Sequence, residues 1–506
     1  MKAKRNHRFD WVAASLAIAL IALSSGCGRS ANPAPKTEAQ QTVTREIWEV
    51  STLGGRRVGY GQTTFFDTTH DGQPAVRIES RVRMTLHREG TAATIELRSW
   101  SLETPGGEVL QFNSTAPAMQ FQGEIRDGKL HLVTASTGHA EQSTLAWSAE
   151  CRGFCGVQQS LWAAPLQAGE RRTLSCLEPT LGQPVAVELA AKEPRETALL
   201  AGSKKLLPIV MTAQVDGRPM LAMNETLWID ESGDILKRRS ELMNVEVFRA
   251  TRDEALAETP RVGPDLLLDI AVPVSRVLEH PHQTRQVRYR LELDGTNPAQ
   301  LFVGGGTQEV RPIDATHAEV TVRAARPGQP LLAGVTETPP TEADRRPSNL
   351  IQSDDPAILA AAEKAAEGRT APAEVAVALE KFVHGAIRDK SYTQAFDSAV
   401  DVLRSGRGDC TEHAVLLAAL CRARGIPARV AMGLVYRDQK FLYHLWTEAF
   451  FDGRWVPLDA TLAQGGIGAA HLKIAHSSLE SRSAYVSLLP VVQVAGKLKI
   501  EILEAE

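Results

Sequence analysis

The spacing of apolar residues changes along this chain, and that change constrains the fold more than any other feature. Before about residue 326, apolar side chains recur at every second position, as Val82, Met84 and Leu86 do, with charged residues between them. Such alternation is typical of a β-sheet with one face in solvent. From residue 348 the spacing becomes helical, for example over residues 375–387. We therefore expect an α+β protein in which antiparallel β-rich domains precede a helical region.

A chain of 506 residues is too long for one hydrophobic core, so several domains are expected. A cluster of prolines predicts a linker, and a last alternation of apolar residues near the C-terminus predicts one further strand. The expected parts are a β-rich domain at 44–260, a small β domain at 262–326, a linker at 327–347, a domain at 348–475 and an extension at 476–506.

Residues 1–27 have the organisation of a signal peptide. Basic residues precede an uncharged apolar stretch, Trp11–Ala22, which is short for a membrane-spanning helix. The following LSSGC sequence resembles a bacterial lipobox, although Leu23 lies one place further from the cysteine than usual. The resemblance implies a lipid on Cys27 and export to the bacterial cell envelope, facing the periplasm. Residues 28–43 are small, polar and proline-bearing, so we expect a flexible tether there, with ordinary cleavage after the signal region as the alternative.

Charge and cysteine content limit the partners and the covalent framework. The formal net charge of -4 offers no basic field, so no nucleic-acid partner is expected. Cys421 lies in an apolar stretch and is expected to be a buried thiol. Among Cys151, Cys155 and Cys176 we expect one disulfide and one spare thiol, with a zinc or redox role as the alternative.

The stretch around Cys410 carries the most informative pattern. Ser405–Asp409 contains two glycines and predicts a tight loop. Ala414–Cys421 is apolar nearly all round, which is typical of a buried helix, and a Gly-Ile-Pro sequence soon ends it. Cys410 would then lie in the first helical turn, where free N–H groups and the helix dipole favour a thiolate and can face an oxyanion. The alternative is a small buried hydrophobic residue at a helix end.

Two strands predicted after this helix offer a base for the thiolate. Asp452-Gly453 between them is a strong signal for a two-residue hairpin loop. With such a loop Trp446 faces Asp459, and the diagonal neighbour of Asp459 is His444, with Cβ atoms roughly 7 Å apart. A loop of three residues would turn Asp459 to the opposite face of the sheet.

Together these residues predict a nucleophile, a base and an orienting acid. Cys410 would attack a carbonyl, His444 would polarise the thiol and protonate the leaving group, and Asp459 would orient the imidazole. A strand histidine and a turn aspartate are the simpler interpretations of each residue alone, but they explain the combination poorly. His413 is a poor candidate base because it is only three residues along the same helix, and His471 has no assigned role.

The ordered blocks around these residues resemble the transglutaminase-like superfamily. The blocks are GDCTEHA, GIPARV, YHLWTEAF and GRWVPLDAT, and the similarity spans about residues 350–465. This resemblance implies a papain-like α+β fold with Cys410 as nucleophile, His444 as base and Asp459 as orienting acid. The backbone N–H of Cys410 is expected to line the oxyanion hole, with Tyr392 or Gln394 as the second donor.

The sequence therefore predicts an exported cysteine enzyme that acts on amide bonds in a protein or peptide, cell-wall peptides included, through an acyl-thioenzyme. Water or an amine would complete the reaction, and the bacterial members of the superfamily favour hydrolysis. No acidic loop has calcium-site spacing, so neither a metal nor a cofactor is expected. The alternative is a non-catalytic assembly or binding protein of the envelope that works through its β-rich N-terminal half.

Overall fold

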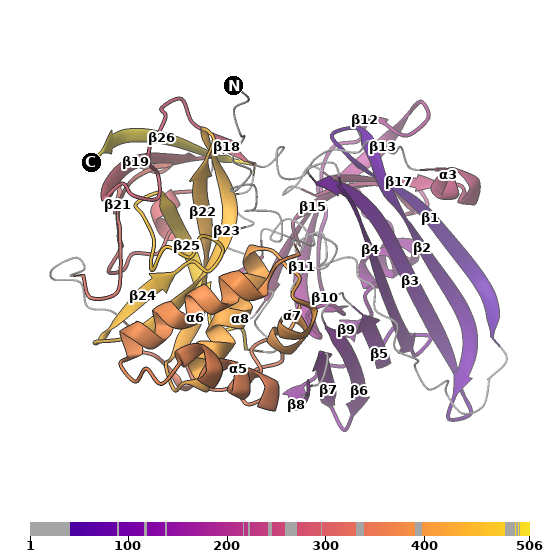
Figure 1. Ribbon diagram of the computed structural model, residues 1–506. Coiled ribbons are helices and arrows are strands. Elements are labelled where there is room, and N and C mark those ends of the chain that lie inside the picture. Colours follow the sequence, from indigo (N-terminus) through magenta and orange to yellow (C-terminus); the bar gives the residue numbers. More distant parts are fainter. Residues whose placement is uncertain are drawn as a thin grey trace. The chain divides into compact units, whose positions relative to one another are not determined.

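The described residues of the computed structural model form two compact units, one within residues 41–258 and the other within residues 271–506 (Figure 1). Antiparallel sheet occurs in both units, and the longer helices occur in the second, so the predicted α+β class is confirmed. The signal segment and Cys27 lie outside the described residues. The described residues are 41–88, 91–115, 119–136, 139–215, 217–220, 223–240, 245–258, 271–294, 296–329, 338–389, 397–480, 491, 494 and 496–506.

The N-terminal unit is built on one long and mainly antiparallel sheet. Its strands are β1 (Thr42–Leu53), β2 (Arg56–His70), β3 (Gln73–Arg88), β4 (Thr91–Glu103), β5 (Val109–Thr115), β6 (Gln120–Arg126), β7 (Lys129–Ser136), β8 (His139–Ala146), β9 (Cys151–Arg152), β10 (Arg171–Glu178), β11 (Gln183–Ala191), β12 (Arg195–Ala198), β13 (Ser203–Val215), β14 (Arg218–Pro219), β15 (Glu225–Ile229), β16 (Ile235–Ser240) and β17 (Val245–Ala250). β1 pairs with both β2 and β17, so the first and last strands of this unit are neighbours. The long strands β1 to β4 lie side by side (Figure 1).

Local sequence explains these strands. In β3, Ile78 and Met84 are buried whereas Arg83 is exposed, as the alternation predicts. A tight turn connects β15 and β16, where an oxygen of the Asp230 carboxylate accepts a hydrogen bond from the Ser232 N–H at 3.0 Å. Side-chain capping of this kind favours a tight turn over continued strand.

Helix α2 (Gly156–Ala163) packs against the sheet and contributes side chains to two of its apolar clusters. Leu161 of α2 is buried with Leu189 and Ile209, which belong to β11 and β13. On the other side, the ring of Trp162 contacts Phe65 of β2 edge-on at 5.5 Å between centroids. A short helix, α3 (Arg252–Leu256), follows β17 and begins with a capping box from Thr251.

The expected disulfide is wrong, because Cys151, Cys155 and Cys176 are all free thiols in the structure. β9 and β10 run side by side in a register that pairs Cys151 with Ser175 and not with Cys176. Successive residues of a strand point to opposite faces, so this one-residue offset separates the two sulfur atoms. Burial raises the pKa of Cys151 to about 11 and that of Cys176 to about 12, which keeps both as neutral thiols at ordinary pH.

The C-terminal unit combines a sheet with a group of helices. The sheet contains β18 (Val272–Pro273), β22 (Ala428–Arg437), β23 (Lys440–Phe451), β24 (Arg454–Leu458) and β25 (His471–Ser477), in the order β18-β23-β22-β25 with β24 on β23. The helices are α5 (Pro356–Ala366), α6 (Pro372–Ala386), α7 (Ala399–Ser405) and α8 (Cys410–Ala423), and a 3-10 turn, η4 (Glu342–Asp344), precedes them. Helix α8 packs on β22 and β23, and the other three helices surround it (Figure 1).

A second sheet of this unit contains β26, the strand near the C-terminus that the sequence predicted. It contains β19 (Gln286–Leu293), β20 (Gln308–Pro312), β21 (His317–Arg323) and β26 (Leu498–Ala505) in the order β20-β21-β19-β26. The C-terminal strand β26 therefore pairs with β19, more than 200 residues earlier in the sequence. Tyr289 of β19 is fully buried, and its hydroxyl donates to the carbonyl of Ala469 at 2.8 Å. The described residues of 271–326 and of 348–475 thus lie in one unit.

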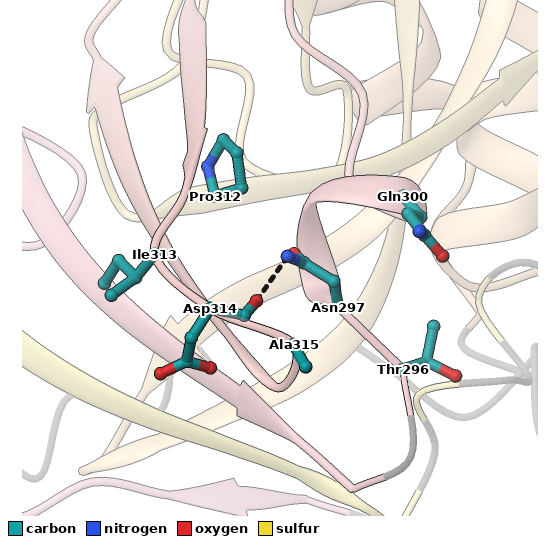
Figure 2. A pocket seen from close by; sticks show the side chains of 7 residues that line it. All are labelled: Thr296, Asn297, Gln300, Pro312, Ile313, Asp314 and Ala315. Carbon is teal, nitrogen blue, oxygen red and sulfur yellow. Dashed lines mark hydrogen bonds between the residues drawn. The ribbon is translucent and has the colours of Figure 1, made fainter.

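A surface pocket at one end of this second sheet offers little chemistry. Figure 2 shows its lining between the 3-10 turn η3 (Pro298–Gln300) and the turn from β20 to β21. The amide of Asn297 donates to the backbone carbonyl of Asp314, and the carboxylate of Asp314 accepts from the N–H groups of Thr316 and His317. The side chains of Asn297 and Asp314 thus already have partners within the protein.

Three charged side chains form a buried cluster on the sheet that contains β22, β23 and β25. Removing the central carboxylate of this cluster should strongly destabilise the fold. The carboxylate of Glu448 accepts from Arg429 at 2.7 Å and from Lys473 at 2.7 Å, and all three side chains are buried. Although burial opposes the charged form, the two cations lower the pKa of Glu448 to about 2. Glu448→Ala would leave two uncompensated cations, so we expect a loss of about 3–5 kcal/mol in the free energy of unfolding, measured by urea denaturation.

The matched control is Glu501→Ala. Glu501 lies on β26 and forms an exposed ion pair with Arg290 of β19. An exposed pair of this kind contributes about 0–1 kcal/mol. Equal midpoints for the two variants would contradict the stabilising role of Glu448. In the wild-type protein, this contribution is present above the ordinary glutamate pKa and is lost as the pH falls towards about 2.

Candidate active site

Cys410 occupies the helix start that the sequence predicted. It is the first residue of α8, Asp409 is the N-cap, and the side chains of Asp409 and Glu412 form a reciprocal capping box. The carboxylate of Asp409 accepts from the N–H of Thr411 at 2.9 Å, and that of Glu412 accepts from the N–H of Asp409 at 2.9 Å. These bonds hold the preceding loop against the helix and place the sulfur at its positive end.

The hairpin register is also confirmed. Phe451 pairs with Arg454, so the loop between β23 and β24 contains only Asp452 and Gly453. Both loop residues have positive φ, 53° and 73°, which matches the backbone of a tight hairpin turn. The pairing continues to Leu458, the last residue of β24, and Asp459 follows it.

This register brings His444 and Asp459 into contact. Nε2 of His444 lies 2.7 Å from Oδ2 of Asp459, and both side chains are fully buried. The other ring nitrogen, Nδ1, has no regular hydrogen bond among the described residues. Asp459 is the main cause that raises the pKa of His444, and an interaction with the Cys410 thiol adds to it. The imidazole therefore lies between a carboxylate and a thiol, as the sequence predicted for the three residues.

His444 and Asp459 each stabilise the charged form of the other. Burial alone would lower the pKa of His444, but the charge and hydrogen bond of Asp459 outweigh it and raise that pKa to about 10. Burial opposes the ionised form of Asp459 as well, yet the two histidines His444 and His471 hold its pKa well below the usual range. At neutral pH the expected state is therefore an imidazolium beside an ionised carboxylate.

His471 is a member of the site that sequence reasoning missed. Its Nε2 lies 3.0 Å from the same Oδ2 of Asp459, and its ring is fully buried. It begins β25, which pairs with β22 and so lies one strand away from β23. Burial lowers the pKa of His471, so the ring is neutral and donates to Asp459 from Nε2. Only the order of strands in the sheet reveals this contact.

Glu380 is a second residue that the sequence did not suggest. It is buried on α6, and its carboxylate accepts from the N–H of Gly465 at 2.9 Å, in the loop that follows Asp459. Burial and the nearby charge of Asp459 raise the pKa of Glu380 to about 8. Glu380 thus holds the loop that carries Asp459 in place.

The aromatic and remaining histidine side chains have different surroundings. Trp446 stacks on His444 at 6.1 Å and meets His471 edge-on at 5.4 Å, so it walls the site. Trp455 contacts Arg429 instead, with the guanidinium carbon 3.8 Å from the ring centroid. Nδ1 of His413 faces the carbonyl of Asp409 on its own helix, which directs the ring away from a role as base.

Some predictions cannot be placed. Tyr392 and Gln394, the expected oxyanion donors, lie outside the described residues. Within the described part of the chain, no helix has the length and apolar character needed to span a bilayer. His444, Asp459 and His471 each offer a donor atom within 4.8 Å of the others, which is the one described group with a geometry suited to a metal ion. Those atoms already share two hydrogen bonds, and no metal was expected from the sequence.

Comparison with known proteins agrees with this geometry. Residues 360–460 match the family model of the transglutaminase-like superfamily. Among curated proteins, no sequence matches the chain. Similar solved structures include a provisionally classed cysteine protease from Cytophaga hutchinsonii (17% identity, 44% of this chain and 85% of that chain, TM-score 0.29). They also include a β-barrel-like protein of unknown function from Brucella abortus (11%, 42% and 98%, TM-score 0.31) and a TGase (14%, 31% and 44%, TM-score 0.18).

All three TM-scores are below 0.5, so the assignment rests on the family model and not on these structures. The matched region begins within α5 and ends just after Asp459, and it includes Cys410 and His444. The chain therefore carries, over residues 360–460, a domain of the transglutaminase-like superfamily.

Proposed function

We propose that this protein is an exported cysteine enzyme that acts on amide bonds through Cys410, His444 and Asp459. The observation that carries the proposal is the imidazole of His444, hydrogen-bonded to Asp459 on one side and next to a thiol at a helix N-terminus on the other. A buried cysteine in a helix needs no such partners for packing alone. A thiolate nucleophile needs both of them.

The reaction would proceed in two steps. The Cys410 thiolate attacks the amide carbonyl carbon, and collapse of the tetrahedral intermediate breaks the C–N bond as His444 gives its proton to the leaving amine. This leaves a thioester on Cys410 and a neutral His444. The imidazole then takes a proton from water or from an acceptor amine, whose oxygen or nitrogen attacks the thioester and releases the thiolate. Asp459 stays ionised throughout and stabilises the imidazolium.

The oxyanion of the intermediate would be held at the start of α8. The backbone N–H of Cys410 is among the first N–H groups of the helix, which have no acceptor within the helix. Tyr392 or Gln394 remains the proposed second donor. Removing one such donor lowers turnover by about 100-fold to 1,000-fold in comparable sites.

Hydrolysis of a protein or peptide, cell-wall peptides included, is the favoured outcome, because water reaches a thioester wherever an acceptor amine is not specifically bound. Export and a lipid on Cys27 are supported by the signal-like first 27 residues alone. They would place the enzyme in the bacterial envelope, facing the periplasm.

The experiment that tests the proposal compares two cysteines of the same helix. Cys410 and Cys421 are both fully buried, but burial raises the pKa of Cys421 to about 12, and no imidazole contributes there. The chain without its first 27 residues is treated with iodoacetamide from pH 5 to pH 9, and labelling is mapped by mass spectrometry. We expect Cys410 to react faster at pH 5 by at least 100-fold. Equal rates would overturn the enzyme proposal and favour a non-catalytic binding protein.

His471 gives a further prediction, as a positioning residue that acts through Asp459. His471→Ala removes one of the two histidine donors to the Asp459 carboxylate, so we expect alkylation of Cys410 at pH 5 to slow by about 10-fold, as loss of outer-shell partners does elsewhere. His471→Gln retains an N–H donor and is expected to recover most of the rate. A purely structural role would instead lower the unfolding midpoint of both variants without separating their alkylation rates.

A further inference from the structure

The N-terminal unit encloses a cavity of about 450 Å³ whose lining residues all belong to that unit. It lies on one face of the sheet, between strands on both sides of β1, because β1 pairs with β2 and with β17. The segment that leads into α2 and the turn after β10 complete its walls. Small-molecule sites typically have volumes of about 300–1,000 Å³. The cavity therefore has the size of a ligand site.

Most of the wall is apolar. Ile47, Val82, Met84, Leu97, Phe154 and Leu227 line it, from β1, β3, β4, the segment before α2, and β15. Along β3, Ser80, Val82 and Met84 share one face of the sheet, as the period of two in a strand requires. An apolar wall of this kind favours the hydrocarbon or aromatic body of a ligand.

The wall of the cavity carries more acidic than basic side chains. The two arginines already have acidic partners: Arg238 lies 3.0 Å from a Glu49 oxygen, and Arg249 lies 3.5 Å from Asp234. Two further carboxyl groups, those of Glu178 and Glu225, face the cavity. One oxygen of Glu178 accepts from the N–H and hydroxyl of Thr180, at 3.1 Å and 2.6 Å. Two acids thus remain without a cation of their own.

Glu225 is the less satisfied of the two acids. Its side chain has neither a hydrogen bond nor an ion pair with any described residue. The charge of Arg238 lowers the pKa of Glu225 without such a contact. Burial raises the pKa of Glu225 and that of Glu178, and the charge of Glu225 raises the pKa of Glu178 further. Both residues are half-buried. A carboxyl group that is partly removed from water without a partner destabilises a fold, so one that faces a cavity points to a ligand group that pairs with it.

We propose that this cavity binds an amphipathic cation, a molecule with an apolar body and a primary ammonium group, with the ammonium group at Glu225 and Glu178. An ammonium group has three N–H donors, enough to reach both carboxylates. The wall residues named above would cover the apolar body. This site is separate from Cys410 in sequence and unit, and the proposal does not depend on the proposed function.

The test uses three probes with the same ten-carbon chain and different head groups: decylamine, decanol and decanoate. Binding to the chain without its first 27 residues is measured by calorimetry at pH 7.5. We expect decylamine to bind at least 10-fold more tightly than decanol, because a charge-assisted hydrogen bond contributes more than a neutral one, and decanoate to bind most weakly. The preference for the amine should decrease as the pH falls, since both carboxyl groups then become neutral.

Two variants show whether the preference arises in the cavity. Glu225→Gln should weaken the preference for decylamine several-fold, since only Glu178 then remains, and should leave decanol binding unchanged, which also shows that the cavity is still folded. The control is Glu231→Gln, an exposed acid in the turn between β15 and β16, which should behave as the wild type. Equal affinity for decylamine and decanol, preference for decanoate, absence of binding, or the same loss in both variants would each overturn the proposal.

Discussion

His444→Ala is expected to slow the alkylation of Cys410 at pH 5 by about 30-fold, with the difference disappearing near neutral pH. The imidazolium of His444 favours the thiolate of Cys410, so its removal leaves mostly the unreactive thiol at pH 5. The loss of rate is only partial, because a thiolate without a cationic partner is the stronger nucleophile. More thiolate forms in the variant as the pH rises, so the difference in rate becomes small.

The change of this rate difference with pH makes the prediction specific. A simple change in the access of iodoacetamide to a buried sulfur would shift the rate by the same factor at every pH. The control variant is His476→Ala, which removes an exposed histidine from the same strand as His471 and lies outside the site. The proposed thiolate–imidazolium pair would be disproved by parallel profiles for wild type and His444→Ala, or by an equal effect of His476→Ala.

Asp459→Asn is expected to lower the pKa of His444 by more than three units, from about 10 to below its ordinary value of 6.5. Burial lowers this pKa, and the charge and hydrogen bond of Asp459 are the main causes that raise it. With a neutral amide, only the smaller effect of the Cys410 thiol would oppose burial. An asparagine also fits poorly, because Oδ1 of Asp459 accepts from the N–H of Thr461 at 2.9 Å while Oδ2 accepts from two histidines. The amide NH₂ group would face a donor in either orientation.

Titration of the histidine ring signals by NMR measures this shift directly, with Asp314→Asn as the control. Asp314 lies in the turn between β20 and β21, with its Oδ1 2.9 Å from Nδ1 of His317, and it is not among the residues of the site. The sign of the stability effect follows from the direction of the shift. A raised pKa of His444 stabilises the wild-type fold below pH 6.5, and this contribution is lost as the pH rises towards about 10. An unchanged pKa of His444 in Asp459→Asn would refute the assigned role of Asp459.

Local sequence was enough to predict much of the site. The glycines before Cys410 and the apolar run after it specify a loop and a buried helix, and both are present. Asp452-Gly453 specifies a two-residue turn, which fixes the register of β23 and β24 and so the meeting of His444 with Asp459. These features depend on backbone preferences and on contacts between residues close in sequence, which a single sequence records directly.

Contacts between distant segments could be decided only by the tertiary structure. His471 joins the site because β25 pairs with β22, Glu380 because α6 lies beside the loop after Asp459, and β26 because it completes the sheet of β19. The cavity of the N-terminal unit likewise exists because β1 pairs with both β2 and β17. Strand alternation shows which residues face inward but not which strands are neighbours, since many pairings of similar strands bury the same apolar faces. The sequence therefore determined the local elements and the place of Cys410 at a helix start, while packing of the whole chain decided the residues that surround them.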